Sequence, residues 1–430
     1  MDLVAALLFT LTIMLVVSRY VDEVAAALAG VTALILLTDY TPEEAFNFVE
    51  WNVIAILLGM WIIAGYMIEG GFTEATIRLV SRKAGTYRKF LLYMALLSGF
   101  ISMFIDNVLV ILLVGSLTVA AAKKAGGNPV LAILLVGFSA NFMGTALLMG
   151  DLPPQLLHTI AGAEFLDFIW TRGKPSSFPL LTATFLLTLG AFYILFIRRE
   201  PNSRLDDTGL SGDSINRRGL LIISLTFFTM TVIAMALRPL LGLPLGFITM
   251  AGASLLALTV EVLRRLGLAG MVEFENALKH VEWRALLFYA ALFSLVGGLE
   301  SEGIIEEIAR LLVGSISSDP AIAYTVMYWS VGLLSLVIEH DALLLTFLYI
   351  VKDAASLAGI DPWNIYWGMA WSATLASNAT TAAAPALYVA VAMADREGHR
   401  VRALEFLKYS LTFAFTSLII HYVITLIVWI

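Results

Sequence analysis

The stretch "FSANFMGTALLMGDLPPQLL", Phe138 to Leu157, interrupts a long apolar run with helix-weakening residues and one carboxylate. Gly144, Gly150 and the pair Pro153–Pro154 all disfavour a continuous helix. If the run crosses a membrane, Asp151 lies at bilayer depth. Irregular backbone and ionisable groups persist there only where they are buried in protein or line a wet cavity. The stretch therefore predicts a broken membrane helix at a solute or ion site.

The composition places the whole chain in a lipid bilayer. Hydrophobic residues make up 60% of the sequence and charged residues 14%, and the mean hydropathy is +0.89. A soluble domain is about half apolar and about a quarter charged. The apolar residues fall in blocks of roughly 17–22, the length that a helix needs to cross about 30 Å of hydrocarbon. We expect an all-α polytopic protein of the cytoplasmic membrane.

Two simpler features of the sequence restrict the chemistry. Cysteine is absent, which excludes thiolate metal sites, redox dithiols and disulfides. The first apolar run follows Met1-Asp2 without a basic region, so we expect a retained helix and not a cleaved signal peptide.

The predicted spans lie near residues 3–18, 22–38, 51–67, 178–197, 219–237, 243–262, 283–299 and 409–430, with longer, polar-interrupted regions at 90–122, 129–160, 320–351 and 363–394.

The chain divides into two similar halves. A Val-Glu-Trp motif opens an apolar run at Val49 and again at Val281. The composition of the polar segment 198–218 between them predicts a cytoplasmic linker. We therefore predict a first repeat over 1–197 and a second repeat over 219–430.

The charges that follow the two motifs indicate that the repeats are inverted. Residues 72–89 hold five basic residues and one acid, whereas residues 300–319 hold five acids and one base. Basic loops remain in the cytoplasm, so equivalent segments of opposite charge belong on opposite faces. Inverted repeats of this kind are a feature of secondary transporters.

A re-entrant hairpin in each half makes this topology consistent. If 72–89 is cytoplasmic, the hairpins bring most basic residues to the same side and both termini to the outer face. The further cytoplasmic segments are then Arg19, Lys123–Lys124, 198–218, 264–284 and 395–408. The basic residues that fall outside the cytoplasmic segments are then Arg172, Lys174, Arg238, Arg310 and Lys352. Without the hairpins, the basic segments scatter to both sides.

Polar groups interrupt the apolar pattern twice in each half. Asp106–Asn107 and Glu339–Asp341 each lie between two apolar arms and predict hairpin tips. Residues 139–154 and 372–385 predict unwound helices, with unwinding around Asn141–Asp151 in the first. Half-helix ends, freed backbone groups and polar side chains would together build a midplane site between the halves.

The motifs resemble those of the ion transporter superfamily, specifically its arsenite permease and P-protein-like branch, which is related to sodium/proton antiporters and divalent anion/sodium symporters. The family pattern Ser-Asn-x-Gly-Gly-Thr-Ala-Thr-x-x-Gly-Asp-Pro-Pro-Asn appears here as "SANFMGTALLMGDLPPQ", with Met143 and Leu147 at a Gly and a Thr position and Leu152 inserted. The resemblance implies a scaffold domain and a transport domain, an elevator-type movement and a homodimer.

The residues and the resemblance together identify the candidate ligands. The resemblance carries over Asp106, Asn107, Asn141, Thr145, Asp151, Asn378 and Thr380, and more loosely Asp341, whose tip departs from the family pattern. The polar and glycine pattern of the breaks adds Ser139, Gly144, Gly150, Thr374 and Ser377.

These observations predict a secondary active transporter of a small inorganic solute or anion, arsenite-like, coupled to H⁺ or Na⁺. A neutral metalloid hydroxide suits amide, hydroxyl and backbone ligands. No cofactor, nucleic acid partner or metal is expected, apart from a coupling Na⁺ at the same site. A sodium/proton antiporter is the first alternative, because carboxylate and carbonyl oxygens suit a hard cation.

Further alternatives remain open from the sequence. A di- or tricarboxylate symporter is disfavoured because acidic tips repel a dianion. An intramembrane aspartyl protease is disfavoured because Leu148 replaces the first glycine of its Gly-x-Gly-Asp motif. Purely structural interpretations also remain. Gly and Pro could only kink the helix, the polar residues of Ser372–Thr381 could form hydrogen bonds between helices, and Glu339–Asp341 could be an outer loop. His158 and His421 are assigned to packing.

Overall fold

The computed structural model describes residues 3–18, 20–204, 217–313 and 319–430. Within these ranges, seven helices are long and apolar enough to cross a membrane, and further apolar helices are shorter. This confirms the prediction of an all-α polytopic membrane protein. Met1–Asp2, Arg19 and most of the predicted linker (205–216) lie outside the described residues.

The helices follow the order expected from the sequence. In the first half they are α1 (Leu3–Ser18), α2 (Glu23–Leu37), α3 (Pro42–Asn47), α4 (Trp51–Glu69), α5 (Phe72–Ala84), α6 (Tyr87–Ser102), α7 (Asn107–Ala125), α8 (Pro129–Met143), α9 (Leu152–Ala161), a 3₁₀ turn (Phe165–Phe168) and α10 (Ser177–Leu195). A small antiparallel pair, β1 (Trp170–Thr171) and β2 (Lys174–Pro175), precedes α10.

The second half also consists of helices. Its helices are α11 (Arg218–Ala236), α12 (Arg238–Leu241), α13 (Leu245–Arg265), α14 (Phe274–Leu278), α15 (Trp283–Ser301), α16 (Ile304–Val313), α17 (Pro320–Leu334), α18 (His340–Ala358), α19 (Trp363–Ser377), α20 (Pro385–Arg396) and α21 (Ala403–Val428). The last helix begins at Ala403, six residues before the predicted start at 409. The prediction was late because it followed the apolar run, and the first turns of the helix contain the polar residues Glu405 and Lys408.

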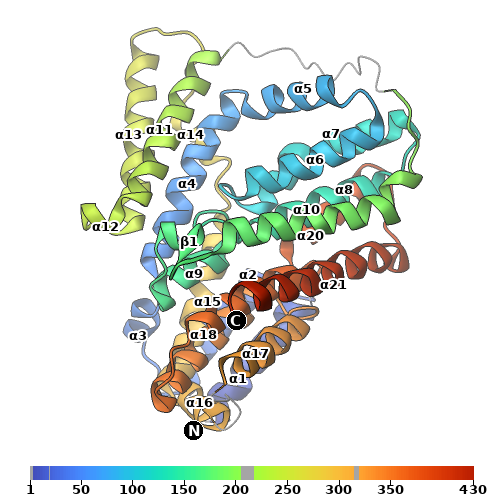
Figure 1. The fold of residues 1–430 in the computed structure, drawn as a ribbon. Coiled ribbons are helices and arrows are strands. Elements are labelled where there is room, and N and C mark those ends of the chain that lie inside the picture. The colour runs from blue at the N-terminus through green and yellow to red at the C-terminus, as the bar shows by residue number, and fades with distance from the viewer. Residues whose placement is uncertain (1–2, 19, 205–216, 314–318) are drawn as a thin grey trace.

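In each half, the helix that follows the Val-Glu-Trp motif packs against the first long helices of the other half. The helix after the first Val-Glu-Trp motif, α4, packs against α11 and α13 of the second half. The helix after the second motif, α15, packs against α1 and α2 of the first half. In Figure 1, α4, α11 and α13 form one column, and α6, α7, α8, α10, α20 and α21 run across beside it in stacked layers.

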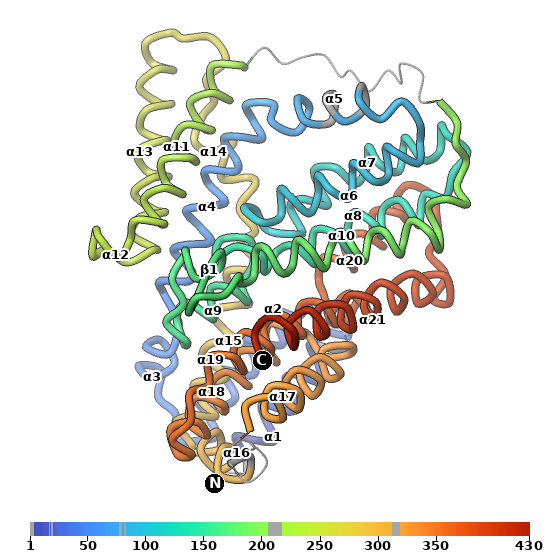
Figure 2. The backbone as a smooth tube through the Cα atoms, in the orientation of Figure 1, coloured from blue at the N-terminus to red at the C-terminus, as the bar shows by residue number. Residues whose placement is uncertain are grey.

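Each polar tip joins two neighbouring helices. Residues Met103–Asp106 turn the chain between α6 and α7, which lie in contact, and residues 335–339 turn it between α17 and α18. Figure 2 shows the first pair running side by side. Asp106 caps α7 by accepting from the backbone N–H groups of Val108 and Leu109, so the acidic residue also fixes where the second arm begins.

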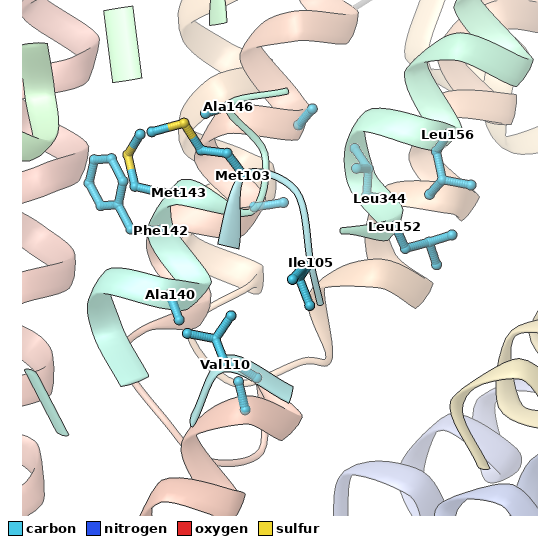
Figure 3. Close-up of a cluster of buried hydrophobic side chains, with 14 of the residues drawn as sticks. Met103, Ile105, Val110, Ala140, Phe142, Met143, Ala146, Leu152, Leu156 and Leu344 are labelled. Carbon is cyan, nitrogen blue, oxygen red and sulfur yellow. The ribbon is translucent and has the colours of Figure 1, made fainter. Parts of the chain in front are cut away.

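Closely packed apolar side chains surround the first tip and the first helix break. Figure 3 shows them converging from the turn before α7, from α7, α8, α9 and α18, and from the irregular segment between α8 and α9. All are buried: Met103, Ile105, Val110, Ala140, Phe142, Met143, Ala146, Leu152, Leu156 and Leu344. Protein interiors are packed about as densely as organic crystals, so irregular backbone that is surrounded by buried side chains has little freedom to move on its own.

Candidate functional site

The opening stretch does break its helix, but later than expected. Regular helix α8 continues to Met143, so Ser139 and Asn141 lie in its last turns and not in unwound backbone. The irregular segment covers Gly144 to Asp151, and α9 then starts at Leu152, directly before the two prolines. Proline suits the first turn of a helix because its missing N–H would have no partner there.

Gly150 permits the close approach that this break needs. A Cβ atom at this position would lie 2.3 Å from the carbonyl oxygen of Gly144 and 2.5 Å from that of Ser102. Ser102 ends α6, next to the first tip. The glycine therefore lets the break and the hairpin tip touch through their backbones.

The second break has a similar construction. Helix α19 ends at Ser377, residues Asn378–Ala384 are irregular, and α20 starts at Pro385. Thr374 and Ser377 thus lie in the last turn of a helix, as Asn141 does in α8. Thr380 lies within the break and donates its hydroxyl hydrogen to the Leu336 carbonyl, which ties the break to the second hairpin.

Buried side chains join the two breaks directly. The Asn141 amide donates to the Ser377 hydroxyl at 2.9 Å and to the Thr374 carbonyl at 3.3 Å. The hydroxyls of Thr145 and Thr374 lie 2.7 Å apart. Residues more than 200 positions apart in the sequence therefore form one polar network, as the two-half interpretation expects.

The first hairpin tip joins this network from one side. The Asn107 side-chain amide donates to Asn141 Oδ1 at 3.0 Å and to Asp151 Oδ2 at 2.9 Å. The other oxygen of Asp151 accepts from the Leu152 N–H at 2.9 Å and caps α9. Asp151 is thereby held between the tip and the break.

The second hairpin tip approaches Asp151 from the opposite half. Glu339, His340 and Asp341 are 3%, 2% and 2% exposed, so they do not form an outer loop. His340 Nε2 lies 4.0 Å from Asp151 Oδ2 and 3.4 Å from Asp341 Oδ1. Both predicted tips and the first break thus converge on one place.

A cavity of about 620 Å³ leads from this place to the surface. Its buried floor carries Asp106, Asn107, Asp151, Glu339, His340 and Asp341. Its mouth carries exposed Tyr20, Asp22, Arg284 and Arg396, of which Arg284 is paired with Asp22. Glu282, Phe288 and Tyr289 of the α15 region line the wall between floor and mouth.

The predicted site residues therefore divide into three groups. Asp106, Asn107, Asp151 and Asp341 line the cavity. Asn141, Thr145, Thr374 and Ser377 form the hydrogen-bonded layer behind it, and Gly144 lies under Asp151, whose Oδ2 atom would be 3.3 Å from an added Cβ. The remaining ones do not line it: Ser139 bonds within its own helix, Gly150 and Thr380 brace the backbone, and Asn378 is buried with Oδ1 unpartnered within the described residues.

The lining residues Glu339, His340 and Glu282 were not among the predicted ligands. Glu339 and His340 were recognised only as part of a polar tip, and the run of three polar residues between apolar arms was the available signal. Glu282 belongs to the Val-Glu-Trp motif, which the sequence marked as a repeat and not as part of a site. Its place in the cavity wall follows from the packing of α15 and had no separate sequence signal.

Asp106 caps α7 and places a carboxylate in the cavity floor. Two substitutions separate these roles. Asp106→Ala removes the helix cap and is expected to destabilise the protein by about 1 kcal/mol. Asp106→Asn keeps an acceptor oxygen for Val108 and Leu109 and is expected to retain most of that stability while removing the charge. Thermal unfolding of the purified variants measures the difference. Equal unfolding temperatures for the two variants would contradict the capping role.

Comparison with known proteins agrees with this architecture. The profile of the CitMHS family, described as citrate transporters, matches residues 13–376. The chain belongs to the CitMHS family. This agrees with the resemblance to the ion transporter superfamily, and it makes the protein a membrane transporter, as its relatives are.

Individual relatives cover nearly the whole of this CitMHS-family chain. An uncharacterised transporter of Mycobacterium bovis is 27% identical over 422 residues, which are 95% of this chain and 94% of that protein. The P protein of Mus musculus is 23% identical over 482 residues, covering 93% of this chain and 56% of that one. Among solved structures, the YdaH transporter of Alcanivorax borkumensis superposes with a TM-score of 0.59 at 13% identity, covering 98% of this chain and 97% of that chain, which shows a shared fold.

Proposed function

We propose that this CitMHS-family protein is a secondary active transporter that couples a small inorganic solute, arsenite-like, to a gradient of H⁺ or Na⁺. One observation carries the proposal. Four carboxyl groups, those of Asp106, Asp151, Glu339 and Asp341, line the buried floor of the cavity. The two arginines that line it, Arg284 and Arg396, lie at its exposed mouth.

This charge distribution favours cation coupling. Several ionised carboxylates cannot share a buried site without compensation, because each loses its hydration and repels the others. Binding of a proton or a Na⁺ ion relieves that repulsion. A carboxyl group that takes up the ion on one side of the membrane and releases it on the other can then couple the ion to solute movement.

The surroundings of the floor suit a small neutral solute. The amides of Asn107 and Asn141 and the hydroxyl groups of Thr145, Thr374 and Ser377 supply neutral donors and acceptors next to the carboxylates. A metalloid hydroxide can exchange hydrogen bonds with such groups without adding negative charge. A free anion would need further cations to enter the same space.

The direction of the cavity supports an alternating-access cycle. Its mouth residues Arg284 and Arg396 belong to segments that the charge pattern assigns to the cytoplasm. We therefore assign this conformation as open to the cytoplasm. The exchanged packing of α4 and α15 supports inverted repeats, with these helices in the scaffold and the hairpins and broken helices in a mobile transport domain. Elevator movement and a homodimer complete this proposal.

Two alternatives share the same site. The acidic floor alone would serve a sodium/proton antiporter. The family description favours a carboxylate symporter of the citrate type, although the acidic floor disfavours a free tricarboxylate. Both alternatives are secondary transporters, so the transported species distinguishes them.

Flux into proteoliposomes tests the proposal. We expect arsenite to accumulate against its gradient only when a pH or Na⁺ gradient is imposed. Citrate uptake without arsenite uptake would replace the proposal with the carboxylate symporter, and Na⁺/H⁺ exchange without either would replace it with the antiporter. Gradient-independent flux of all three solutes would exclude a secondary active transporter.

A further inference from the structure

One face of α9 carries polar side chains that lead away from the acidic floor. Asp151, Gln155 and Thr159 are spaced by four residues, so they follow one another along the same side of the helix. Gln155 is fully buried, and both of its amide atoms lack a hydrogen-bond partner among the protein groups of the described residues. The Thr159 hydroxyl oxygen is also buried and unpartnered within the same part of the chain. This face therefore holds unmet hydrogen-bonding capacity next to Asp151.

The polar face of α9 runs from the floor toward the outer side of the membrane. The helix has 10 residues, and its length of about 15 Å is about half the hydrocarbon thickness of a bilayer. It starts after Asp151 and ends before the loop that contains Glu164. Glu164 forms an ion pair with Arg238, which the charge pattern places outside the cytoplasm. Helix α9 thus connects the cavity floor with the face opposite to the cavity mouth.

The ion pair of Glu164 and Arg238 lies at the outer end of this polar face. His158, in the last turn of α9, interacts electrostatically with both charges. Its Nδ1 lies 2.8 Å from the Ala163 carbonyl oxygen, which can only accept, so Nε2 of the neutral ring carries the lone pair. The outer end therefore combines an acceptor nitrogen with an ion pair.

The same ion pair joins two parts that an alternating-access cycle would separate. Glu164 follows α9 of the proposed transport domain, whereas Arg238 begins α12, which contacts α11 of the proposed scaffold. Both side chains are partly buried, and Glu164 Oε2 and Arg238 Nε have no hydrogen-bond partner within the described residues. Movement of one domain against the other would break the pair and admit water to both atoms.

The helix of the second half that corresponds to α9 lines the open cavity. Helix α20 also follows a helix break and begins at a proline, and its residues Tyr388, Val389, Ala392 and Met393 line the way to the cytoplasm. In a pair of inverted repeats, α9 has the same relation to the outer passage. The lining of α20 is mainly apolar, whereas the face of α9 described above is polar, which suits a chain of water molecules.

We propose that the polar face of α9 is a water-mediated proton route from the outer side to Asp151, closed in this conformation by the ion pair of Glu164 and Arg238. Buried polar groups are almost always hydrogen-bonded to protein or to ordered water, so Gln155 and Thr159 are sites for bridging water. This inference rests on the proposed function and deepens it, because it selects H⁺ as the coupling ion and gives its path.

The route needs no chemical change in the residues that line it. A hydronium ion at the outer end gives up one proton, each water molecule takes one proton and passes one on, and the Asp151 carboxylate takes the last. Gln155 and Thr159 only order the water. The titratable groups that surround the acceptor carboxylate are Asp106, His340 and Asp341.

Proton leak into liposomes tests the route without any transported solute. The purified full-length protein is reconstituted with a pH-sensitive dye inside, the membrane potential is clamped, and acid is added outside. The cavity already connects Asp151 with the cytoplasmic side, so opening the outer end should let protons cross. Arg238→Gln is expected to raise proton entry at least about fivefold, the factor that corresponds to the loss of one partly exposed ion pair.

A matched variant controls for the loss of an outer ion pair. Arg172 also forms an ion pair on the outer side, but this pair joins the β1–β2 turn to Asp361 in the loop between α18 and α19. Arg172→Gln should therefore leave proton entry at the level of the unaltered protein. Absence of a leak in Arg238→Gln would overturn the proposed route.

Second substitutions in Arg238→Gln identify the path of the leak. Gln155→Leu and Thr159→Val are each expected to return proton entry to the level of the unaltered protein, and either decides the question if the other fails to fold. Thr188→Val should leave the leak unchanged, because the Thr188 hydroxyl is likewise buried and unpartnered within the described residues but belongs to α10. A leak that survives both Gln155→Leu and Thr159→Val would overturn the route. The expected leak in a protein that does not move arsenite would support the route and overturn only the solute of the proposed function.

Discussion

Asp151→Asn is expected to abolish gradient-driven flux, with a loss of at least about 100-fold. Asp151 connects the first break to both tips: it accepts from Asn107 and Leu152, and its Oδ2 faces His340. Losing a charged partner in a buried network costs about 3 kcal/mol, and each 1.4 kcal/mol corresponds to a factor of ten. Ion-driven uptake into proteoliposomes measures the effect.

The same variant should still fold. An Asn oxygen can accept from the Leu152 N–H as the carboxylate does, so the cap of α9 is preserved. Asp167→Asn is a matched control, because Asp167 also accepts from a backbone N–H, that of Glu164, but lies outside the cavity. Coupled flux that survives in Asp151→Asn, with both variants monodisperse, would refute the role assigned to Asp151.

Gly150→Ala is expected to prevent correct assembly of the site. The added Cβ would approach the carbonyl oxygens of Gly144 and Ser102 to 2.3 and 2.5 Å, and both obstacles are backbone atoms that cannot rotate away. Overpacking of this kind costs about 1–3 kcal/mol in cores where side chains can adjust, and we expect a larger cost here. Size-exclusion profiles and thermal unfolding of the purified variant give the measurement.

Gly190→Ala supplies the comparison for that experiment. Gly190 lies inside α10, and no atom lies within 4 Å of the position its Cβ would take. Because Ala favours a helix over Gly, the control should be as stable as the unaltered protein or slightly more so. If Gly150→Ala were equally stable, the close contact between the break and the first tip would not be needed.

The helix breaks show what the local pattern of Gly and Pro can predict and what it cannot. Gly144, Gly150 and the two prolines correctly indicated that the helix stops before Asp151. The onset of the break was predicted too early, because Asn141 keeps its helical backbone while its side chain bonds across to Ser377. Local propensity shows that a chain will break, but a distant partner decides at which residue.

The environment of His340 could not be predicted from the sequence. Its sequence neighbours Glu339 and Asp341 predicted a hairpin tip, and an outer loop was the alternative that three polar residues left open. The carbonyl of Ala383, from the second break, determines which ring nitrogen is free. That contact joins segments 43 residues apart, so no window of sequence could reveal it.

The sequence by itself determined the class of the protein, the approximate spans, the two broken helices and the acidic tips. These depend on hydropathy, chain length and the conformational limits of Gly and Pro, which are local properties. Only the tertiary structure decided that both tips and the first break meet around Asp151, and that Glu282 and His340 join them. Convergence of this kind depends on how distant helices pack, and packing is a property of the whole fold rather than of any segment.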